Sequence, residues 1–294
     1  MSASRRRLLV VGASGLLGTA VVEAATGEGH RVLGAARRVR GLARRALDLT
    51  QREQIDSVLD AFEPEVVVLC SAYPHVDGCE ADPARSTAEN VQTVANVIQA
   101  THGSQTKIVF FSTDQVFDGA LASYQESDAA RPLNVYARHK REAEKLLLER
   151  GDSLIVRSAW IFGEELDRKN FMYRVIAAAR ASGKLIVPAD QVGCPTWSRW
   201  LAESALLLLA QEMNGIVHLA GSEALSKAEW ARLIVEHLGL AQLAIGEVSP
   251  EEAGQVAPRP QRVVLRSQRH SLIQPALASI LSSERRRFLG SSSP

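Results

Sequence analysis

Long apolar runs and a dominant charge sign are both missing from this chain of 294 residues. No stretch approaches the roughly 20 consecutive apolar residues that a membrane-spanning helix needs. The formal net charge is +1, so no overall field attracts the chain to nucleic acid or to an anionic membrane surface. We therefore expect neither nucleic acid nor a membrane among its partners.

Cysteine is scarce as well, with only Cys70, Cys79 and Cys194. None of them has a CxxC or Cys/His spacing, so we expect no metal site, and an odd number without a framework fits a reducing cytoplasm. The run Arg5–Val11 looks like the start of a signal peptide. Its apolar part is short and passes directly into a glycine-rich turn, so we expect a cytoplasmic protein.

Short β-branched runs alternate with helical stretches over the first half of the chain. The runs are nearly unbroken by polar residues, which is typical of strands buried on both faces of a parallel sheet. The alternation predicts an α/β fold with a Rossmann-type, doubly wound parallel sheet. The expected strands are Leu8–Val11, Arg31–Ala35, Val66–Cys70, Lys107–Ser112 and Leu154–Arg157, and the expected helices are Leu16–Ala25, Arg52–Phe62, Arg85–Thr101 and Val135–Arg150.

This rhythm loosens after Trp160, where proline and glycine become more frequent. We expect residues 1–160 to form a dinucleotide-binding domain and residues 161–294 to form mainly a smaller, less regular substrate lobe. Two later strands, near 184–190 and 215–220, are expected to join the main sheet. The expected helices are Asn170–Ala181, Ser198–Glu212 and Ser226–Leu238.

Three glycines with the spacing GxxGxxG follow the first strand and open the first helix. Glycine permits a tight turn and close approach to a pyrophosphate, and the helix N-terminus supplies free N–H groups. The alternative is a tight strand–helix turn with no ligand. The predicted phosphate-binding residues are Gly12, Ala13, Ser14, Gly15, Leu16, Leu17 and Gly18.

Two arginines, Arg37 and Arg38, follow the second strand, where an NAD site usually carries an acidic residue. Because guanidinium pairs well with a 2′-phosphate, we predict NADPH as the cofactor, with NADH as the alternative. A solvated loop is the other interpretation of these arginines. Further along, Asp48 and Leu49 end a further short strand that is expected before the helix Arg52–Phe62, and the acid is placed either to accept from an adenine amino group or to cap the next helix.

A proton-donating group is predicted between Ser112 and Lys140. The fourth strand ends in two hydroxyl residues, and Tyr136 lies one helical turn before Lys140 on the same face of a helix. A nearby cation lowers the pKa of a phenol toward neutrality, and Ser112 or Thr113 is placed to hydrogen-bond a substrate oxygen. The alternative is an ordinary surface pair of tyrosine and lysine.

Several motifs together resemble the extended short-chain dehydrogenase/reductase superfamily, and within it the dTDP-4-dehydrorhamnose reductases. The resemblance covers the chain from about Leu8 to Leu265. The segment 112–119 is similar to STDYVFDG, and the segment 190–196 is similar to DQxGxPT; both are more specific than the glycine motif. Further matches are Pro132–Tyr136, Val156–Trp160 with its RxSW pattern, Asn170–Phe171, and Arg259–Pro260 followed by Leu265.

The resemblance implies an NADPH-dependent reductase of the 4-keto group of a nucleotide-linked 4-keto-6-deoxy sugar. Tyr136 would protonate the carbonyl oxygen, Lys140 would lower its pKa and hold the cofactor ribose, and Thr113 would bind the reacting oxygen. The resemblance leaves a homodimer open. It implies that Cys70, Ser71 and Ala72 run along the cofactor, and that Ser112, Asp114, Gln115, Trp160, Asn170 and Arg259 line the substrate site.

Departures from the family pattern leave the substrate open. Gln115 replaces a tyrosine, His139 replaces a small hydroxyl residue, and Pro74, His75 and Gly78 alter a pocket wall. The histidines are either pocket donors or structural. Three alternatives remain: a non-catalytic NADP-binding regulator like the β-subunit of methionine adenosyltransferase, a sugar nucleotide epimerase or dehydratase, and a reductase of another carbonyl compound.

Overall fold

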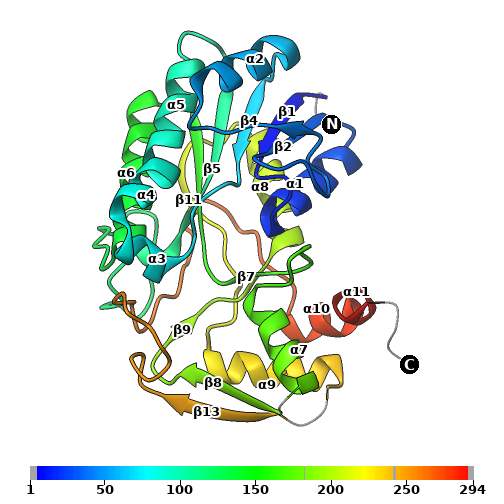
Figure 1. Ribbon diagram of the computed structural model, residues 1–294, viewed down its shortest axis with the longest axis vertical. Helices are drawn as coiled ribbons and strands as arrows, with labels where there is room; N and C mark the ends of the chain where they lie inside the picture. The colour runs from blue at the N-terminus through cyan, green and yellow to red at the C-terminus, as the bar shows by residue number, and fades with distance from the viewer. Residues whose placement is uncertain (1–4, 182, 241–242, 291–294) are drawn as a thin grey trace.

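A seven-stranded parallel sheet forms the centre of the larger of two lobes (Figure 1). The computed structural model describes residues 5–181, 183–240 and 243–290. The strand order is β11-β6-β5-β4-β1-β2-β3, which confirms the doubly wound fold. The strands are β1 (Arg7–Val11), β2 (Arg31–Ala36), β3 (Arg45–Ala46), β4 (Val66–Leu69), β5 (Lys107–Thr113), β6 (Ser153–Ser158) and β11 (Gly215–His218).

Helices cover both faces of this sheet because successive strand residues point to opposite sides. Leu8 and Val10 pack against α1 and α8, whereas Leu9 and Val11 pack on the side of α2, α5 and α6. Both faces of the sheet are therefore buried under helices, as the unbroken apolar runs in the strands predict. The helices are α1 (Leu16–Gly27), α2 (Arg52–Phe62), α5 (Thr93–Ala100), α6 (Val135–Arg150) and α8 (Ser198–Ala210).

The helix expected over Arg85–Thr101 is a longer, composite element. It begins with α4 (Pro83–Thr87), passes through a π-helical segment at Ala88–Gln92 and continues as α5. The Asp82 carboxylate accepts from the Arg85 backbone N–H at 3.0 Å and caps the start of this element. The short α3 (Val76–Ala81) precedes it.

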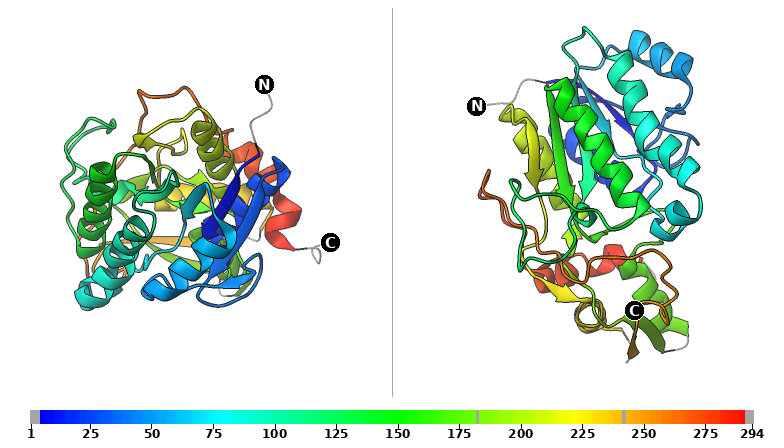
Figure 2. Two further views of the ribbon diagram at one scale, coloured as in Figure 1. Left: turned by 90° about the horizontal axis from the view of Figure 1, so that it is seen from above. Right: turned by 90° about the vertical axis from the view of Figure 1, so that its left-hand side faces the viewer.

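The smaller lobe lies below the carboxyl ends of the strands and has its own core (Figures 1 and 2). Trp230, fully buried, packs edge-on against Phe162 at 4.9 Å between ring centroids. The elements are α7 (Phe171–Ala181), α9 (Lys227–Leu238), α10 (Leu277–Ser283) and α11 (Arg285–Leu289), with short strands β7 (Ile161–Phe162), β8 (Lys184–Pro188), β9 (Val192–Gly193), β10 (Thr196–Trp197), β12 (Leu225–Ser226) and β13 (Ala244–Val248).

One strand prediction is wrong. The strand near 184–190 does not join the main sheet; β8 pairs with β13 in a separate ribbon of the lower lobe. Its side chains alternate between exposed and buried, which suits a ribbon that is covered on one face only. The strand near 215–220 is β11 and pairs with β6 at the edge of the main sheet. Residues 198–218 thus return to the upper lobe, so chain order does not follow the two lobes.

Within the described part of the chain, every helix is too short or too polar to cross a bilayer.

Candidate active site

The glycine turn lies between β1 and α1, at the carboxyl edge of the sheet. Gly12 has φ +90°, and a Cβ there would lie 2.7 Å from the Ser71 nitrogen. A Cβ on Gly18 would lie 2.1 Å from the Gly12 carbonyl oxygen. These two positions therefore require glycine for the turn itself.

Gly15 is different, because a Cβ there would meet only the Gly12 oxygen, at 3.4 Å. It occupies the N-cap position of α1, and no side chain caps this helix end. The space above Gly15 and the free N–H groups of a twelve-residue helix form a cradle that fits a pyrophosphate.

The loop Cys70–Ala72 follows β4 and lies against this turn, which places the predicted cofactor loop beside the glycines. The Cys70 backbone N–H donates to the Val11 carbonyl at 2.9 Å. Asn90, in the π-helical segment, bonds both the N–H and the carbonyl of Tyr73, at 2.9 and 3.1 Å, and so fixes the end of the loop. Burial raises the pKa of the Cys70 thiol, which disfavours a thiolate there.

Arg37 and Arg38 are exposed directly after β2. Arg37 pairs with Glu89 at 3.1 Å, and Glu89 also accepts from Arg85 at 2.8 Å. Glu89 thus holds Arg37 at the edge of the predicted nucleotide site.

Asp48 and Leu49 have structural contacts. The Asp48 carboxylate accepts from the backbone N–H and the hydroxyl of Thr50, at 2.9 and 2.8 Å, and so shapes the turn before α2. Leu49 is buried, and its carbonyl accepts from Asn96 on α5.

Thr113, Tyr136 and Lys140 come together where β5 ends and α6 begins. Asn134 is the N-cap of α6: its side-chain oxygen accepts from the Ala137 N–H at 2.8 Å, and its amide donates to the Pro258 carbonyl at 2.9 Å. This cap fixes the first turn, which carries Tyr136. Lys140 is buried and donates to the Phe111 carbonyl at 2.7 Å.

The expected lowering of the Tyr136 pKa by Lys140 is wrong. The pKa of Tyr136 is raised, first by burial and then by the negative charge of Asp114, while a hydrogen bond with Thr113 lowers it by less. The ammonium of Lys140 points to a carbonyl instead, and burial lowers its own pKa to about 7. Tyr136 is thereby kept protonated, which is the form that donates a proton.

Asp114 and Gln115 follow Thr113 in a single 3₁₀ turn. The Thr113 hydroxyl donates to the Asp114 carboxylate at 3.1 Å and accepts from the Gln115 N–H at 3.2 Å. Burial raises the pKa of Asp114 to about 6. The Gln115 side chain accepts from Asn134, so the departure from the family tyrosine is tied to the α6 cap.

Ser112 is turned away from this group. Its hydroxyl donates to Glu144 at 2.6 Å, and the same carboxylate accepts two bonds from Arg157 at 2.8 and 2.7 Å. Glu144 and Arg157 are almost completely buried. We therefore remove Ser112 from the predicted substrate residues and assign it to the polar core beneath the site.

Trp160 and Asn170 lie at the junction of the two lobes. Trp160 has φ +42°, and its indole fills the space that a Cβ on Gly193 would need. Asn170 donates to the Gly163 carbonyl at 2.9 Å and positions the start of α7. Its side-chain oxygen is buried and has no partner among the described residues.

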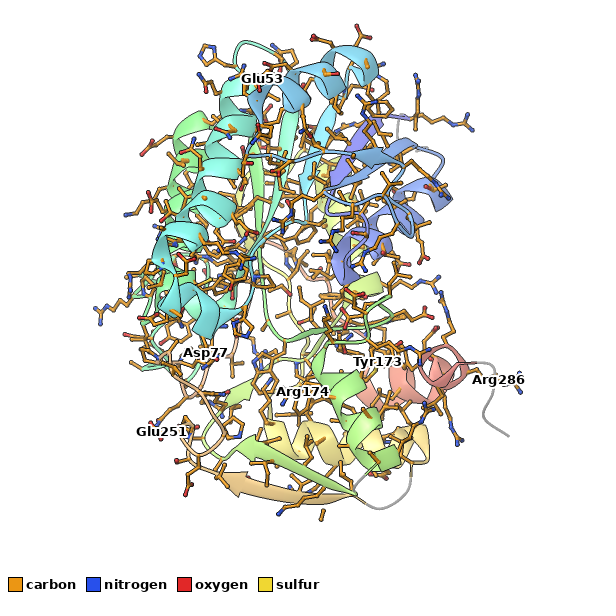
Figure 3. The ribbon with its side chains drawn as sticks, in the orientation of Figure 1. Glu53, Asp77, Tyr173, Arg174, Glu251 and Arg286 are labelled. Carbon is orange, nitrogen blue, oxygen red and sulfur yellow. The ribbon has the colours of Figure 1, made fainter. Side chains whose placement is uncertain are left out.

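Arg259 is held by an acid from the other lobe. It makes two bonds to Asp77 on α3, at 2.7 and 3.1 Å, and Asp77 also accepts the backbone N–H groups of Val256 and Ala257. Burial opposes ionisation of Asp77, but these bonds lower its pKa to about 2. Figure 3 shows Asp77 at the end of the upper lobe that faces the lower one. The pair ties the segment 256–259 to the upper lobe.

The two substituted histidines have structural partners. His75 caps α3 by accepting from the Gly78 N–H at 2.7 Å. His139 bridges α6 to α4 through the hydroxyls of Ser86 and Thr87, at 2.8 and 3.2 Å. Both therefore stabilise the wall of the site.

Several positioning residues lacked a usable sequence signal. Asp77 bonds Arg259, which lies 182 positions away in the sequence. The position of Glu144 on its helix does not distinguish it in the sequence from an exposed acid. Asn134 carries the ordinary signature of a helix cap and was detectable from it. Lys227 opens α9 in the lower lobe, and only the tertiary fold brings it to Trp160.

Comparison with known sequences places the chain in a family. The sequence model of the family described as the RmlD substrate binding domain matches residues 6–277. A dTDP-4-dehydrorhamnose reductase of Aggregatibacter actinomycetemcomitans is 33% identical, over 78% of each chain. Methionine adenosyltransferase 2 subunit beta of Danio rerio is 30% identical, over 91% of this chain and 85% of its own.

Solved structures agree with this placement. A dTDP-4-dehydrorhamnose reductase from Bacillus anthracis, in complex with NADP, has a TM-score of 0.86 and 26% identity, and the match covers 97% of this chain and 99% of that one.

Proposed function

The chain belongs to the RmlD substrate-binding-domain family, and from this premise we propose that it reduces the 4-keto group of a nucleotide-linked 4-keto-6-deoxy sugar with NADPH. One observation carries the proposal. The hydroxyls of Thr113 and Tyr136 meet at the same edge of the sheet as the open cradle at Gly15. A proton donor beside a dinucleotide cradle is the arrangement that carbonyl reduction needs.

The residues present fit the cofactor. The N-terminus of α1 would hold the pyrophosphate, the Cys70–Ala72 loop would run beside it, and Arg37 with Arg38 would bind the 2′-phosphate. Lys140 would reach the ribose hydroxyls. NADPH supplies the hydride when it is bound.

The protein's own part in the reaction is proton transfer and orientation. Tyr136 donates its proton to the carbonyl oxygen, which Thr113 orients through a hydrogen bond. Burial keeps the phenol protonated before the transfer and disfavours the phenolate afterwards.

The decisive experiment is NADPH oxidation by the wild-type protein with a panel of 4-keto-6-deoxy sugar nucleotides and simple ketones. We expect turnover with at least one sugar nucleotide and none with the simple ketones. Turnover of simple ketones alone would contradict the proposed substrate class.

The cradle gives a prediction for Gly18→Ala. The new Cβ would collide with the Gly12 carbonyl, so the turn must open, at a cost of about 1–3 kcal/mol. We expect NADPH to bind at least tenfold more weakly in a fluorescence titration. Gly27→Ala is the matched control, because a Cβ at Gly27 of α1 meets nothing within 4 Å. Equal affinities in the two variants would contradict the assignment.

The arginines give a prediction about cofactor choice. In the double variant Arg37→Ala/Arg38→Ala, the ratio of kcat/KM for NADPH to that for NADH should fall about 10- to 100-fold, because the loss of a single charge-assisted bond to the 2′-phosphate costs about 1.5–3 kcal/mol. Arg131→Ala is the control, since its side chain is 74% exposed and pairs with Asp118 and not with a residue of the predicted nucleotide site. A wild-type preference for NADH would overturn the prediction.

A second candidate is the role of a non-catalytic, NADP-binding subunit. The likeness to methionine adenosyltransferase 2 subunit beta favours it. Tight NADPH binding without turnover of any sugar nucleotide would support this role against the reductase.

We also propose a cytoplasmic location, which the three free cysteines suit, and a homodimer. Sedimentation equilibrium with and without NADPH tests the second point.

A further inference from the structure

Lys227 is a lower-lobe residue whose side chain reaches the predicted substrate site. It is the first residue of α9, and the helix start is fixed by a capping box between Ser226 and Glu229. Its ammonium lies 3.2 Å from the centroid of the Trp160 ring and 4.8 Å from that of Phe171. The two rings hold the charge in one place.

In the part of the chain that the structure describes, the donors of this ammonium have no acceptor. Among the described residues, Lys227 has neither a carboxylate within 4.0 Å nor a hydrogen-bond partner. Burial lowers its pKa to about 7, the charge of Asp114 raises it, and the charges of Arg174 and Arg259 lower it. Arg174 lies on α7 near the junction of the lobes (Figure 3).

Asp114 is the acid whose charge raises the pKa of this ammonium. Burial raises the pKa of Asp114, and the charge of Lys227 opposes that shift. Asp114 is bonded to Thr113, the residue next to the proton donor Tyr136. Lys227, held over Trp160 at the junction of the lobes, and Asp114, bonded to Thr113, therefore supply a donor and an acceptor to the same predicted substrate site.

We propose that Lys227 and Asp114 form a donor–acceptor pair that binds the sugar hydroxyl on the carbon next to the ketone, so that the lower lobe selects the sugar. A hydroxyl both accepts and donates, so it satisfies both partners. A phosphate or carboxylate would satisfy Lys227 but would meet the charge of Asp114. The inference rests on the proposed reductase function.

The test compares two substrates in three proteins. The substrates are 4-keto-6-deoxy sugar nucleotides with and without the hydroxyl at C3. In the wild type, kcat/KM should be at least tenfold higher for the hydroxylated sugar. In Lys227→Met that ratio should fall to about one, mainly through KM, with NADPH affinity within twofold of the wild type. Lys169→Met, at an exposed lysine of the same lobe, should keep the ratio.

Lys227→Arg keeps a cation over Trp160 and should restore most of the discrimination. If Lys227→Met does not fold, Lys227→Gln replaces it in the same comparison. A ratio in Lys227→Met within twofold of the wild type would overturn the inference and leave the reductase function standing. A wild type that reduces no ketosugar nucleotide would overturn both.

Discussion

Tyr136→Phe should lower kcat by about 10³-fold while NADPH binds with unchanged affinity. A positioned general acid contributes about 10²- to 10⁴-fold, and Tyr136 is the phenol that interacts with Thr113 at the edge of the sheet where the glycine turn lies. Because the ring remains, the packing of α6 is preserved and the loss is confined to the proton. Steady-state kinetics with a ketosugar nucleotide measure kcat, and fluorescence titration measures NADPH binding.

Tyr173→Phe is the matched control for this variant. Tyr173 is a buried tyrosine on α7 in the lower lobe, and its removal should change kcat by less than twofold. If Tyr136→Phe kept more than a tenth of the wild-type kcat, a different group or water would be the acid.

Glu144→Ala should lower the free energy of unfolding by about 3–5 kcal/mol. The variant leaves Arg157, which is 1% exposed, without its carboxylate in the core. It also removes the acceptor of the Ser112 hydroxyl directly below the site. Urea unfolding at neutral pH measures the effect. Glu203→Ala, which breaks an exposed pair with Arg199 on α8, should cost less than about 1 kcal/mol.

The buried pair of Glu144 and Arg157 also predicts how the stability of the protein depends on pH. Burial opposes ionisation of Glu144, but the bonds from Arg157 outweigh it and lower the pKa of Glu144. A lowered pKa in the folded state contributes stability that is present above the unfolded value, about 4.3, and is lost as the pH falls through the folded value. Glu144→Ala should therefore lose less stability on acidification than the wild type. An equal loss in both would mean that Glu144 is not the acid that titrates.

Local patterns were enough to predict most of the upper lobe. Buried parallel strands need unbroken apolar runs, and the glycine turn and the Tyr136–Lys140 spacing each span only a few residues of the chain. The strand near 184–190 was misplaced because a run of apolar residues does not show which strand it pairs with. Only its one-sided burial distinguishes β8 from a strand of the main sheet.

The direction in which the pKa of Tyr136 shifts could not be predicted from the spacing of Tyr136 and Lys140 in the sequence. The i,i+4 relation of Tyr136 and Lys140 places both on one helix face, but it does not show where the ammonium points. The fold directs it to the Phe111 carbonyl and buries the phenol near Asp114, so the pKa of Tyr136 rises instead of falling.

By itself the sequence indicated the sheet, the cradle at the first turn and the hydroxyl–phenol–lysine set, because each is marked by a local pattern: unbroken apolar runs, a glycine spacing, and residue types at set positions along a strand or a helix. The tertiary structure decided which hydroxyl serves the core, which acid holds Arg259, and that Lys227 reaches Trp160. Those contacts join segments 32, 182 and 67 positions apart. Such contacts exist only in the folded chain, so no local pattern encodes them.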